Sequence, residues 1–261
     1  MPIPLSLPDT FAQRLDAAEA AQVGLFLSSG SETNAEIVAS AGFDWLLIDA
    51  EHSPYTLDTV SRLLRTVQPY PASPVVRLPV GDAVLIKQYL DLGAQNLMIP
   101  MVHTAEQAEQ AVSAMRYPPR GIRGIGAALA RSSRYSGVPD YLNVAEETIS
   151  LTVQIESGEA VANAEAIAGV DGVDAVFIGP SDLAASMGYL GQQQHPEVLE
   201  AVSTTFAAVK KAGKHVGINA FNLEQAHSYV DAGADFVCIG ADVQQLAGAV
   251  RSLVGTFKGE N

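Results

Sequence analysis

The chain has 261 residues, of which 48% are hydrophobic, so it is long enough to bury the core of one large domain. Its formal net charge is -14 and it carries no Lys/Arg stripe, which argues against nucleic acid as a partner. No apolar stretch is long enough to span a bilayer, and the N-terminus lacks the order of a secretory signal. The single cysteine, Cys238, excludes an intramolecular disulfide and fits a reducing compartment. We therefore expect a cytoplasmic protein that acts on neither membranes nor nucleic acids.

Short aliphatic runs alternate along the whole chain with longer helical patterns, and no composition break divides them. Eight such strand–helix units predict an α/β protein with one domain over residues 1–261, folded as a closed (β/α)₈ TIM barrel. An open, doubly wound sheet is the competing fold, but eight evenly spaced units favour closure. The expected strands are 23–29, 45–49, 74–78, 96–102, 151–156, 175–179, 215–220 and 235–240. The expected helices are 34–41, 57–67, 83–92, 105–115, 159–168, 196–212, 223–232 and 243–257.

Three joints place a glycine just past an expected helix, at Gly42, Gly93 and Gly233, where a left-handed conformation ends a helix. Two segments fall outside the eight units. Residues 11–20 predict an extra helix that caps the N-terminal end of the barrel. Residues 117–141 form a long connection rich in Arg, Pro and Gly, and such loops are usually functional or interfacial.

Four of the expected strands end on charged or hydrogen-bonding residues, where a buried strand ordinarily ends on an aliphatic side chain. Buried charges are costly unless they are paired or hold a metal. The carboxyl ends of the strands of a barrel carry its active site. The four runs, 45–52, 75–79, 151–156 and 174–182, therefore predict one assembled active site.

Two carboxylates are candidate metal ligands. Alternation along the fifth strand points Gln154 and Glu156 into the barrel, because Leu151, Val153 and Ile155 share the other face. Two acids at one mouth, Glu156 and Asp182, would repel each other unless a cation or a proton lies between them. A hard divalent ion takes few protein oxygens and leaves positions for substrate and water. The alternative is that each acid caps a local helix, as Asp182 would before a short helix at 183–187.

Arg77, Asp49 and His52 are the candidate catalytic residues. An inward guanidinium needs an anionic partner, either Asp49 or a substrate oxygen that becomes negative. Asp49 and His52 lie three residues apart at a strand end, and a carboxylate that orients an imidazole prepares a base. A lone histidine more often has a structural role. No lysine stands at a strand end, so a Schiff base is excluded and activation of a carbonyl would require a metal.

These strand ends resemble those of the HpcH/HpaI aldolase family, whose members are metal-dependent (class II) pyruvate aldolases. The similarity covers nearly the whole chain, from about Leu25 to the last helix. It is carried by Asp49-Ala50-Glu51-His52, Val75-Val76-Arg77, Gln154-Ile155-Glu156 and Phe177-Ile178-Gly179-Pro180-Ser181-Asp182-Leu183.

The resemblance implies reversible cleavage of 4-hydroxy-2-oxo acids to pyruvate, or a related 2-oxo acid, and an aldehyde, through a metal-stabilised enolate. It implies that Glu156 and Asp182 bind Mg²⁺, Mn²⁺ or Co²⁺, that Arg77 steadies the enolate, and that His52 with Asp49 serves proton transfer. Gln154 would support the metal site, and the backbone at Ser181 and Asp182 would receive the substrate carboxylate. Members assemble as hexamers, dimers of trimers, with the last helix exchanged between neighbours.

The sequence leaves other functions open. A 2-dehydro-3-deoxy-sugar-acid aldolase and a CoA-thioester lyase would use the same scaffold, although a CoA user needs a basic patch that the sequence lacks. A phosphate-binding barrel isomerase needs a glycine cluster after strand seven, where this chain has none. A barrel without catalytic activity, serving as an assembly module, comes from a different class.

Overall fold

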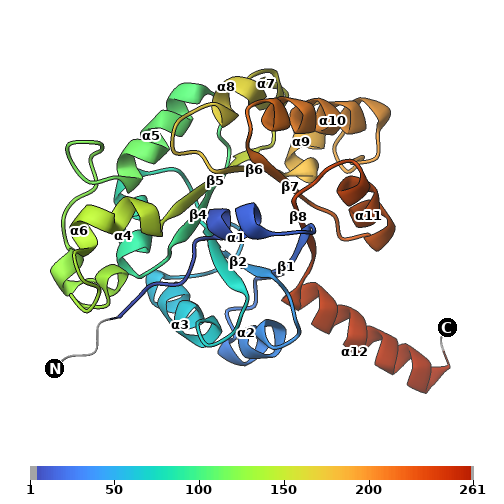
Figure 1. Cartoon of the computed structure of the whole chain (residues 1–261). Coiled ribbons are helices and arrows are strands. Elements are labelled where there is room, and N and C mark those ends of the chain that lie inside the picture. Colours follow the sequence, from blue (N-terminus) through green and yellow to red (C-terminus); the bar gives the residue numbers. More distant parts are fainter. Residues whose placement is uncertain (1–4, 260–261) are drawn as a thin grey trace.

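The computed structural model describes residues 5–259 of the chain. Within that range, eight parallel strands close into a barrel in the order in which they follow one another along the chain (Figure 1). The strands are β1 (Gln22–Leu27), β2 (Trp45–Asp49), β3 (Ser73–Arg77), β4 (Asn96–Ile99), β5 (Ser150–Ile155), β6 (Ala175–Ile178), β7 (His215–Asn219) and β8 (Phe236–Ala241). The predicted (β/α)₈ barrel is therefore confirmed, and the competing open sheet is wrong.

Helices surround the barrel wall, and each predicted strand and helix is found within a few residues of its expected bounds. The helices are α1 (Phe11–Ala17), α2 (Glu32–Ala39), α3 (Leu57–Val67), α4 (Ala83–Asp91), α5 (Ala105–Met115), α6 (Tyr141–Val144), α7 (Gly158–Ala162), α8 (Ala164–Ala168), α9 (Pro180–Ser186), α10 (Pro196–Lys211), α11 (Leu223–Asp231) and α12 (Asp242–Lys258). The expected helix 159–168 is two helices, because Asn163 ends α7 and turns its side-chain amide to the carbonyl of His103 at 2.8 Å. No helix among the described residues is long and apolar enough to cross a membrane.

The predicted helix-stop glycines adopt the expected conformation. Gly42, Gly93 and Gly233 have φ values of 95°, 91° and 105°, each just after a helix and before the next strand. Only glycine takes this region without steric cost, so these residues set where each helix turns back to the barrel.

The expected N-terminal capping helix is present as α1, which lies across one end of the barrel in Figure 1. Thr10 and Gln13 form a capping box at its start, and the backbone N–H of Phe11 donates to Asn96 Oδ1 at 2.7 Å. The Phe11 ring enters the barrel and packs 5.4 Å from the Trp45 ring and 5.2 Å from the Phe236 ring. This helix closes the end opposite the strand carboxyl ends, so the remaining opening is at the predicted site.

Two layers of apolar side chains hold the barrel. The outer layer lies between strands and helices and includes Leu151, Val153 and Ile155, so the predicted phase of β5 is confirmed. The inner layer fills the barrel with large rings, among them Trp45, Phe177 and Phe236. Phe177 and Phe236 stack with their ring centres 5.7 Å apart. Because these rings fill the interior, functional groups can lie only at the rim formed by the carboxyl ends of the strands.

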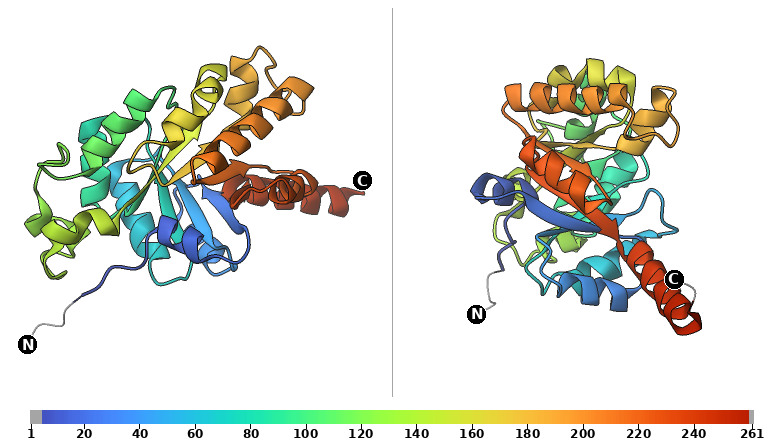
Figure 2. Two further views of the ribbon diagram at one scale, coloured as in Figure 1. Left: turned by 45° about the horizontal axis from the view of Figure 1, so that its top comes forward. Right: turned by 90° about the vertical axis from the view of Figure 1, so that its right-hand side faces the viewer.

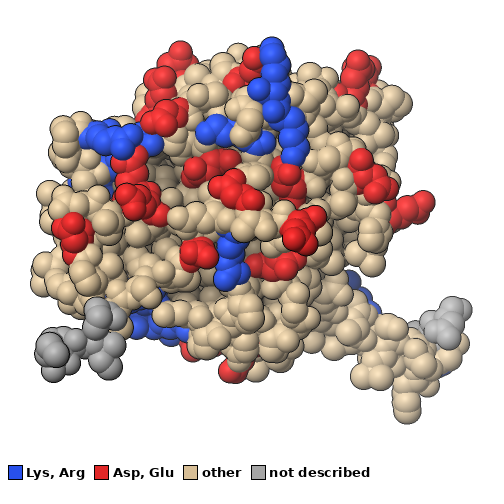
Figure 3. Space-filling model, viewed as in Figure 1, with Lys and Arg blue, Asp and Glu red and all other residues tan. Residues whose placement is uncertain are grey.

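Acidic side chains outnumber basic ones in the chain, 29 to 15, and many lie on the surface. On the face drawn in Figure 3, Asp and Glu side chains are scattered among the Lys and Arg side chains, and no broad basic stripe crosses that face. The most distinctive feature of the outline is α12, which projects away from the barrel wall in all views (Figure 2).

Gly24 leaves space for the Trp45 ring inside the barrel, and the need for this space can be tested by substitution. A Cβ on Gly24 would lie 2.3 Å from Trp45 Cε2, and the ring cannot retreat because it is fully buried. We expect Gly24→Ala to destabilise the protein by about 1–3 kcal/mol through overpacking. Urea unfolding measures this loss. Gly248→Ala on α12, where a Cβ would meet nothing within 4 Å, is the matched control, and equal loss in both variants would contradict the explanation.

Candidate active site

The carboxyl ends of β2 and β3 place Asp49 and Arg77 side by side, because these two residues are register partners in the sheet. Arg77 Nε donates to Asp49 Oδ1 at 3.0 Å, and Arg77 Nη2 lies 2.9 Å from the same oxygen. Asp49 is 3% exposed and Arg77 6%, so the pair is buried. Of the two partners that the sequence left open for Arg77, the structure provides the carboxylate of Asp49.

Two further groups hold the Arg77 guanidinium. Arg77 Nη1 lies 3.0 Å from Glu51 Oε2, and the Arg77 Cζ lies 5.1 Å from the centre of the Phe26 ring. A guanidinium has five N–H groups in a fixed plane. The two carboxylates bind the edge of that plane and the Phe26 ring packs against its face, so the orientation of Arg77 is fixed. Sequence reasoning assigned Glu51 no role, although it stands between Asp49 and His52. Its contact with Arg77 depends on the turn that follows β2.

Asp49 also shapes that turn. Its Oδ1 accepts the backbone N–H groups of Glu51 at 3.1 Å and of His52 at 3.3 Å. The His52 imidazole points elsewhere: its side chain is 67% exposed, and its Nε2 lies 3.8 Å from Glu51 Oε2. Asp49 therefore positions the His52 backbone, and the carboxylate that faces the imidazole belongs to Glu51. The predicted contact between the Asp49 carboxylate and the His52 imidazole is therefore wrong.

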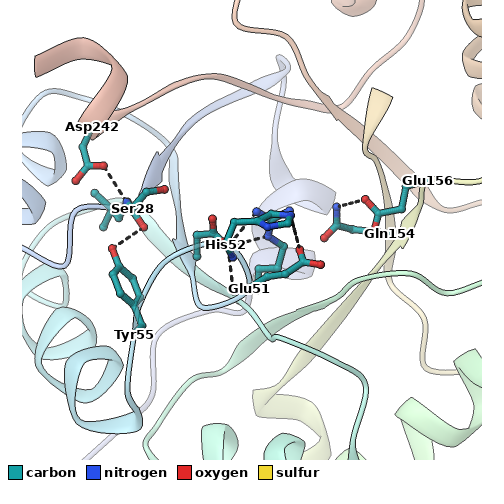
Figure 4. Close-up of polar contacts among 10 residues, drawn as sticks. Ser28, Glu51, His52, Tyr55, Gln154, Glu156 and Asp242 are labelled. Carbon is teal, nitrogen blue, oxygen red and sulfur yellow. Dashed lines mark hydrogen bonds and ion pairs between the residues drawn. The ribbon is translucent and has the colours of Figure 1, made fainter. Parts of the chain in front are cut away.

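Across the mouth, β5 presents Gln154 and Glu156 side by side, as the alternation predicted (Figure 4). Gln154 Nε2 donates to Glu156 Oε2 at 3.1 Å, and the backbone N–H of Met101 donates to Glu156 Oε1 at 2.8 Å. Gly179 allows this placement, because a Cβ there would lie 2.3 Å from Glu156 Oε2. The Met101 and Gly179 contacts come from neighbouring loops, so the sequence of β5 alone gives no signal of them.

The charges around Glu156 disfavour its ionised form. Burial raises the pKa of Glu156 to about 7, and the negative charges of Glu51 and Asp182 act in the same direction. The Met101 N–H and the positive charge of Arg77 oppose that rise in pKa. Burial likewise raises the pKa of Glu51, with Arg77 opposing it. The mouth therefore holds more negative charge than its own cation balances.

Neither candidate metal ligand, Glu156 or Asp182, is a helix cap, so that alternative is wrong. Ser157, and not Glu156, caps α7, since its side chain accepts the N–H of Ala160. Asp182 lies in the first turn of α9, where Gly179 is the cap residue and no side chain makes a capping hydrogen bond. Neither acid makes a capping hydrogen bond, so both are available for another role.

The donor set fits a hard divalent cation. Gln154 Oε1 is buried and has no hydrogen-bond partner among the described residues, although an amide oxygen needs one. Two carboxylates and an unpaired amide oxygen are oxygen groups of the kind such ions prefer. Within residues 5–259, no three His, Cys, Asp or Glu side chains converge into a metal cluster. Glu156 and Asp182 would therefore leave the other positions to substrate and water.

The substrate-facing candidate Ser181 lies in the first turn of α9, beside Asp182. Its hydroxyl accepts a hydrogen bond from Gln193 Nε2 at 2.6 Å. Because the amide donates, the Ser181 hydroxyl hydrogen remains available for another acceptor. Sequence reasoning missed Gln193, which lies in the loop after α9 and carries no motif of its own.

A second polar cluster supports the neighbouring loop after β1 (Figure 4). Asp242, the first residue of α12, accepts the backbone N–H groups of Ser28 at 2.8 Å and Ser29 at 3.2 Å. The Tyr55 hydroxyl donates to the Leu27 carbonyl at 3.0 Å and accepts the Gly30 N–H at 2.8 Å. Burial is the main cause that raises the pKa of Tyr55 to about 12. The start of α12 is thereby fastened to the rim of the barrel.

The remaining candidates lie outside this constellation. His103 Nδ1 contacts Ser157 Oγ at 2.8 Å, and His215 is paired with Asp16 and Asp235 at the opposite end of the barrel. Lys210 and Lys211 form ion pairs on the helical layer. Cys238 is fully buried, and burial raises the pKa of its thiol.

Comparison with known proteins identifies relatives over nearly the full chain. Residues 22–249 match the family model described as HpcH/HpaI aldolase/citrate lyase. The chain is 48% identical over 256 residues to a hydroxypyruvate/pyruvate aldolase of Pseudomonas aeruginosa, covering 98% of this chain and 95% of that protein. It is 49% identical over 239 residues to a 4-hydroxy-2-oxo-heptane-1,7-dioate aldolase of Salmonella paratyphi A, covering 92% and 91%.

A solved structure agrees with these sequence relatives. The crystal structure of an HpcH/HpaI aldolase/citrate lyase family protein from Burkholderia cenocepacia J2315 superposes with a TM-score of 0.91 at 40% identity. That match covers 95% of this chain and 98% of the other.

Proton competition at Glu156 predicts how metal binding depends on pH. A ligand carboxyl must be deprotonated, so affinity is full above the pKa of about 7 and falls as pH drops below it. We expect the dissociation constant for Mn²⁺ to rise about tenfold per pH unit below that value, since one proton competes per ion. Titration calorimetry on wild type, Glu156→Gln and the exposed control Glu159→Gln measures this. Unchanged binding in Glu156→Gln would contradict the ligand assignment.

Proposed function

Because the chain belongs to the HpcH/HpaI aldolase/citrate lyase family, we propose that it reversibly cleaves 4-hydroxy-2-oxo acids to pyruvate, or a related 2-oxo acid, and an aldehyde. Membership of this family makes it a carbon–carbon lyase. The observation that carries the proposal is the buried Arg77 guanidinium, fixed by Asp49 and Glu51, at the same rim as Glu156 and Gln154. This arrangement favours an oxygen that gains negative charge.

Arg77 is the residue that meets that charge. Removal of a proton from C3 of a 2-oxo acid moves negative charge onto its keto oxygen, and a preorganised cation lowers the barrier to that step. All three guanidinium nitrogens face Asp49 or Glu51, yet each Nη group still has a second N–H. Arg77 can therefore donate to an enolate oxygen without giving up the contacts that position it.

Glu156 and Asp182 would hold a divalent ion, either Mg²⁺, Mn²⁺ or Co²⁺. When bound, such an ion supplies a Lewis acid to the keto oxygen. Gln154 keeps the Glu156 carboxylate in place through its Nε2, and its buried Oε1 has no hydrogen-bond partner among the described residues. We infer that the backbone at Ser181 and Asp182 receives the substrate carboxylate, with the Ser181 hydroxyl as an additional donor.

His52 is assigned to proton transfer. Its imidazole is 67% exposed, so it can pass protons between the site and solvent. Asp49 fixes the backbone of His52, and Glu51 lies closest to its ring. Asp49 therefore serves proton transfer as a positioning residue.

The other carbon–carbon lyases on this scaffold are less favoured. No specific observation supports a 2-dehydro-3-deoxy-sugar-acid substrate or a CoA thioester, whereas the two relatives described above are named for pyruvate and 4-hydroxy-2-oxo acid chemistry. We also infer that residues 1–261 form one domain, since the described elements all belong to the barrel and its coverings. The cytoplasmic location expected from the sequence stays a prediction.

Removal of Arg77 gives the first test. A retro-aldol assay across 4-hydroxy-2-oxo acids, with released pyruvate coupled to lactate dehydrogenase, should show turnover that chelation abolishes and Mn²⁺ or Co²⁺ restores. In Arg77→Ala we expect turnover to fall by about 10³-fold, because a fixed charge facing the developing oxyanion is lost. Mn²⁺ affinity should be retained. Arg62→Ala, on the exposed face of α3, is the control, and wild-type turnover in Arg77→Ala would refute the assigned role.

We propose further that α12 packs against a second copy of the chain. Its apolar side chains Leu246, Val250, Leu253 and Phe257 recur at helical spacing and are exposed, Phe257 by 92%. Beside its first turn lies a groove of about 600 Å³ between α2 and α11, lined by Ile37, Phe43, Phe221, Leu223 and Ile239 among others. The eighth helix of a closed barrel would cover this groove, but α12 points outward (Figure 2). Exchange of α12 between copies would bury both surfaces.

Substitution on α12 tests this exchange. Leu253→Glu places a charge in the proposed contact, so we expect the assembly to break into smaller species. Ser252→Glu, on the opposite side of the same helix, should leave the assembly intact. Light scattering after size exclusion gives both masses, and the hexamer that the resemblance implies is checked in the wild type. A wild-type monomer, or an unaltered mass for Leu253→Glu, would contradict the exchange.

A further inference from the structure

A second polar pocket lies at the opposite end of the barrel from the candidate active site. It has about 60 Å³ of free space and is lined by the first residues of β3 and β4, the end of α3, the segment before α1, and the long loop after α5. Among its lining residues are Arg14, Arg131 and Arg134. The long loop, which the sequence marked as functional or interfacial, thus contributes two arginines to this place.

These arginines have no acidic partner among residues 5–259. Arg131 is 6% exposed, and its guanidinium donates to the neutral oxygens of Leu92 and Gln68. Arg134 donates to the Arg131 carbonyl at 2.9 Å, and Arg14 donates to the Pro71 carbonyl. Arg65, which follows the lining residue Leu64 on α3, donates to the Tyr135 hydroxyl at 3.1 Å. Among the described residues, none of the four is in an ion pair.

The positive charges converge. The Nη1 atoms of Arg131 and Arg134 lie 2.6 Å and 3.2 Å from the point that a Cβ on Gly93 would occupy. Glycine at this helix stop therefore lets two guanidinium groups approach one another. Burial lowers the pKa of Arg131 to about 10, and the charges of Arg134 and Arg65 add to that effect. Like charges held together in a chain with 29 acidic residues require a reason.

A buried hydroxyl in the same lining provides independent support. Ser73 is 4% exposed, and its Oγ has no hydrogen-bond partner among the described residues. A buried hydroxyl without a partner is costly, so such groups usually face a ligand or water. Asp9 also lines the pocket, but it lies beyond 4.0 Å of every guanidinium nitrogen there.

We propose that this pocket binds a phosphate-sized oxyanion, with inorganic phosphate as the ligand. Guanidinium groups donate in planes that match tetrahedral oxyanions, and several unpaired arginines favour a multiply charged ion over a monoanion. The small free volume admits the ion itself and excludes a nucleotide or a sugar phosphate from full entry. The bound ion would join α3, the long loop and the start of β3 at the closed end of the barrel.

The test measures phosphate binding by the assembled full-length protein. Calorimetric titration with phosphate is carried out with a chelator present and with chloride at matched ionic strength as the reference. We expect one saturable site in the wild type, and a rise in melting temperature with phosphate, since a ligand of the folded state stabilises it. Sulfate, which has the same shape, should compete, whereas glycerol phosphate should bind more weakly.

Four variants locate the site. Arg134→Gln should weaken phosphate binding by about tenfold, because a charge-assisted pair of hydrogen bonds is removed. Ser73→Ala, which removes only a hydroxyl, should weaken it about threefold and still fold. Arg62→Gln, on α3 with its own acidic partners, and Arg77→Gln, at the active site, should bind as the wild type does.

Three outcomes would overturn the proposal. One is the lack of saturable binding by the wild type. Another is binding that Arg77→Gln abolishes while Arg134→Gln and Ser73→Ala retain it, which would locate the anion at the active site. The third is binding only by the Leu253→Glu species and not by the assembled protein, which would mean that a second copy fills the pocket.

Discussion

The buried pair of Asp49 and Arg77 is the interaction on which the site depends. Register in the sheet makes the two residues neighbours, and one carboxylate oxygen receives two guanidinium nitrogens and two backbone N–H groups of the following turn. Loss of Arg77 leaves the buried Asp49 carboxylate without its ion-pair partner, which costs about 3–5 kcal/mol. The same contact thus sets the direction of the cation and the path of the loop that carries His52. A misplaced Asp49 would disturb both at once.

Around this pair the charges do not balance, and the imbalance supports the proposed cation site. Glu51 and Asp182 add to the pKa rise of Glu156, and the positive charge of Arg77 opposes it. For Glu51, Arg77 and His52 both oppose the rise in pKa. Burial raises the pKa of Glu156 to about 7 and the repulsion adds to that rise, so protonation of Glu156 is one way to relieve the repulsion. A divalent ion is the other, and it would keep both carboxylates ionised. Gln154 Oε1, which has no hydrogen-bond partner among the described residues, is a further oxygen that such an ion could contact.

The sequence predicted the fold and the inward-facing side chains because both follow from periodicity. Eight repeated units imply closure, and alternation along β5 orients Gln154 and Glu156 without knowledge of any neighbour. The missing parts depend on contacts between distant segments. The Met101 amide and the bare Cα of Gly179 reach Glu156 from other loops, and the pairing of Glu51 with Arg77 depends on a turn. The partner of the His52 imidazole was misjudged for the same reason, since spacing of three residues does not show which atoms meet.

The last helix illustrates how a local contact can govern assembly. Its apolar stripe predicts a packed helix, but the pattern cannot say against which molecule it packs. Asp242 settles the direction: it accepts N–H groups from the loop after β1, so α12 must begin at the catalytic rim. From that fixed point the helix leaves the barrel wall, and the groove between α2 and α11 stays open. A neighbour that captures α12 would therefore pull on the same residue that holds the rim loop. In the proposed exchange, the Asp242 carboxylate would link assembly to the geometry of the mouth.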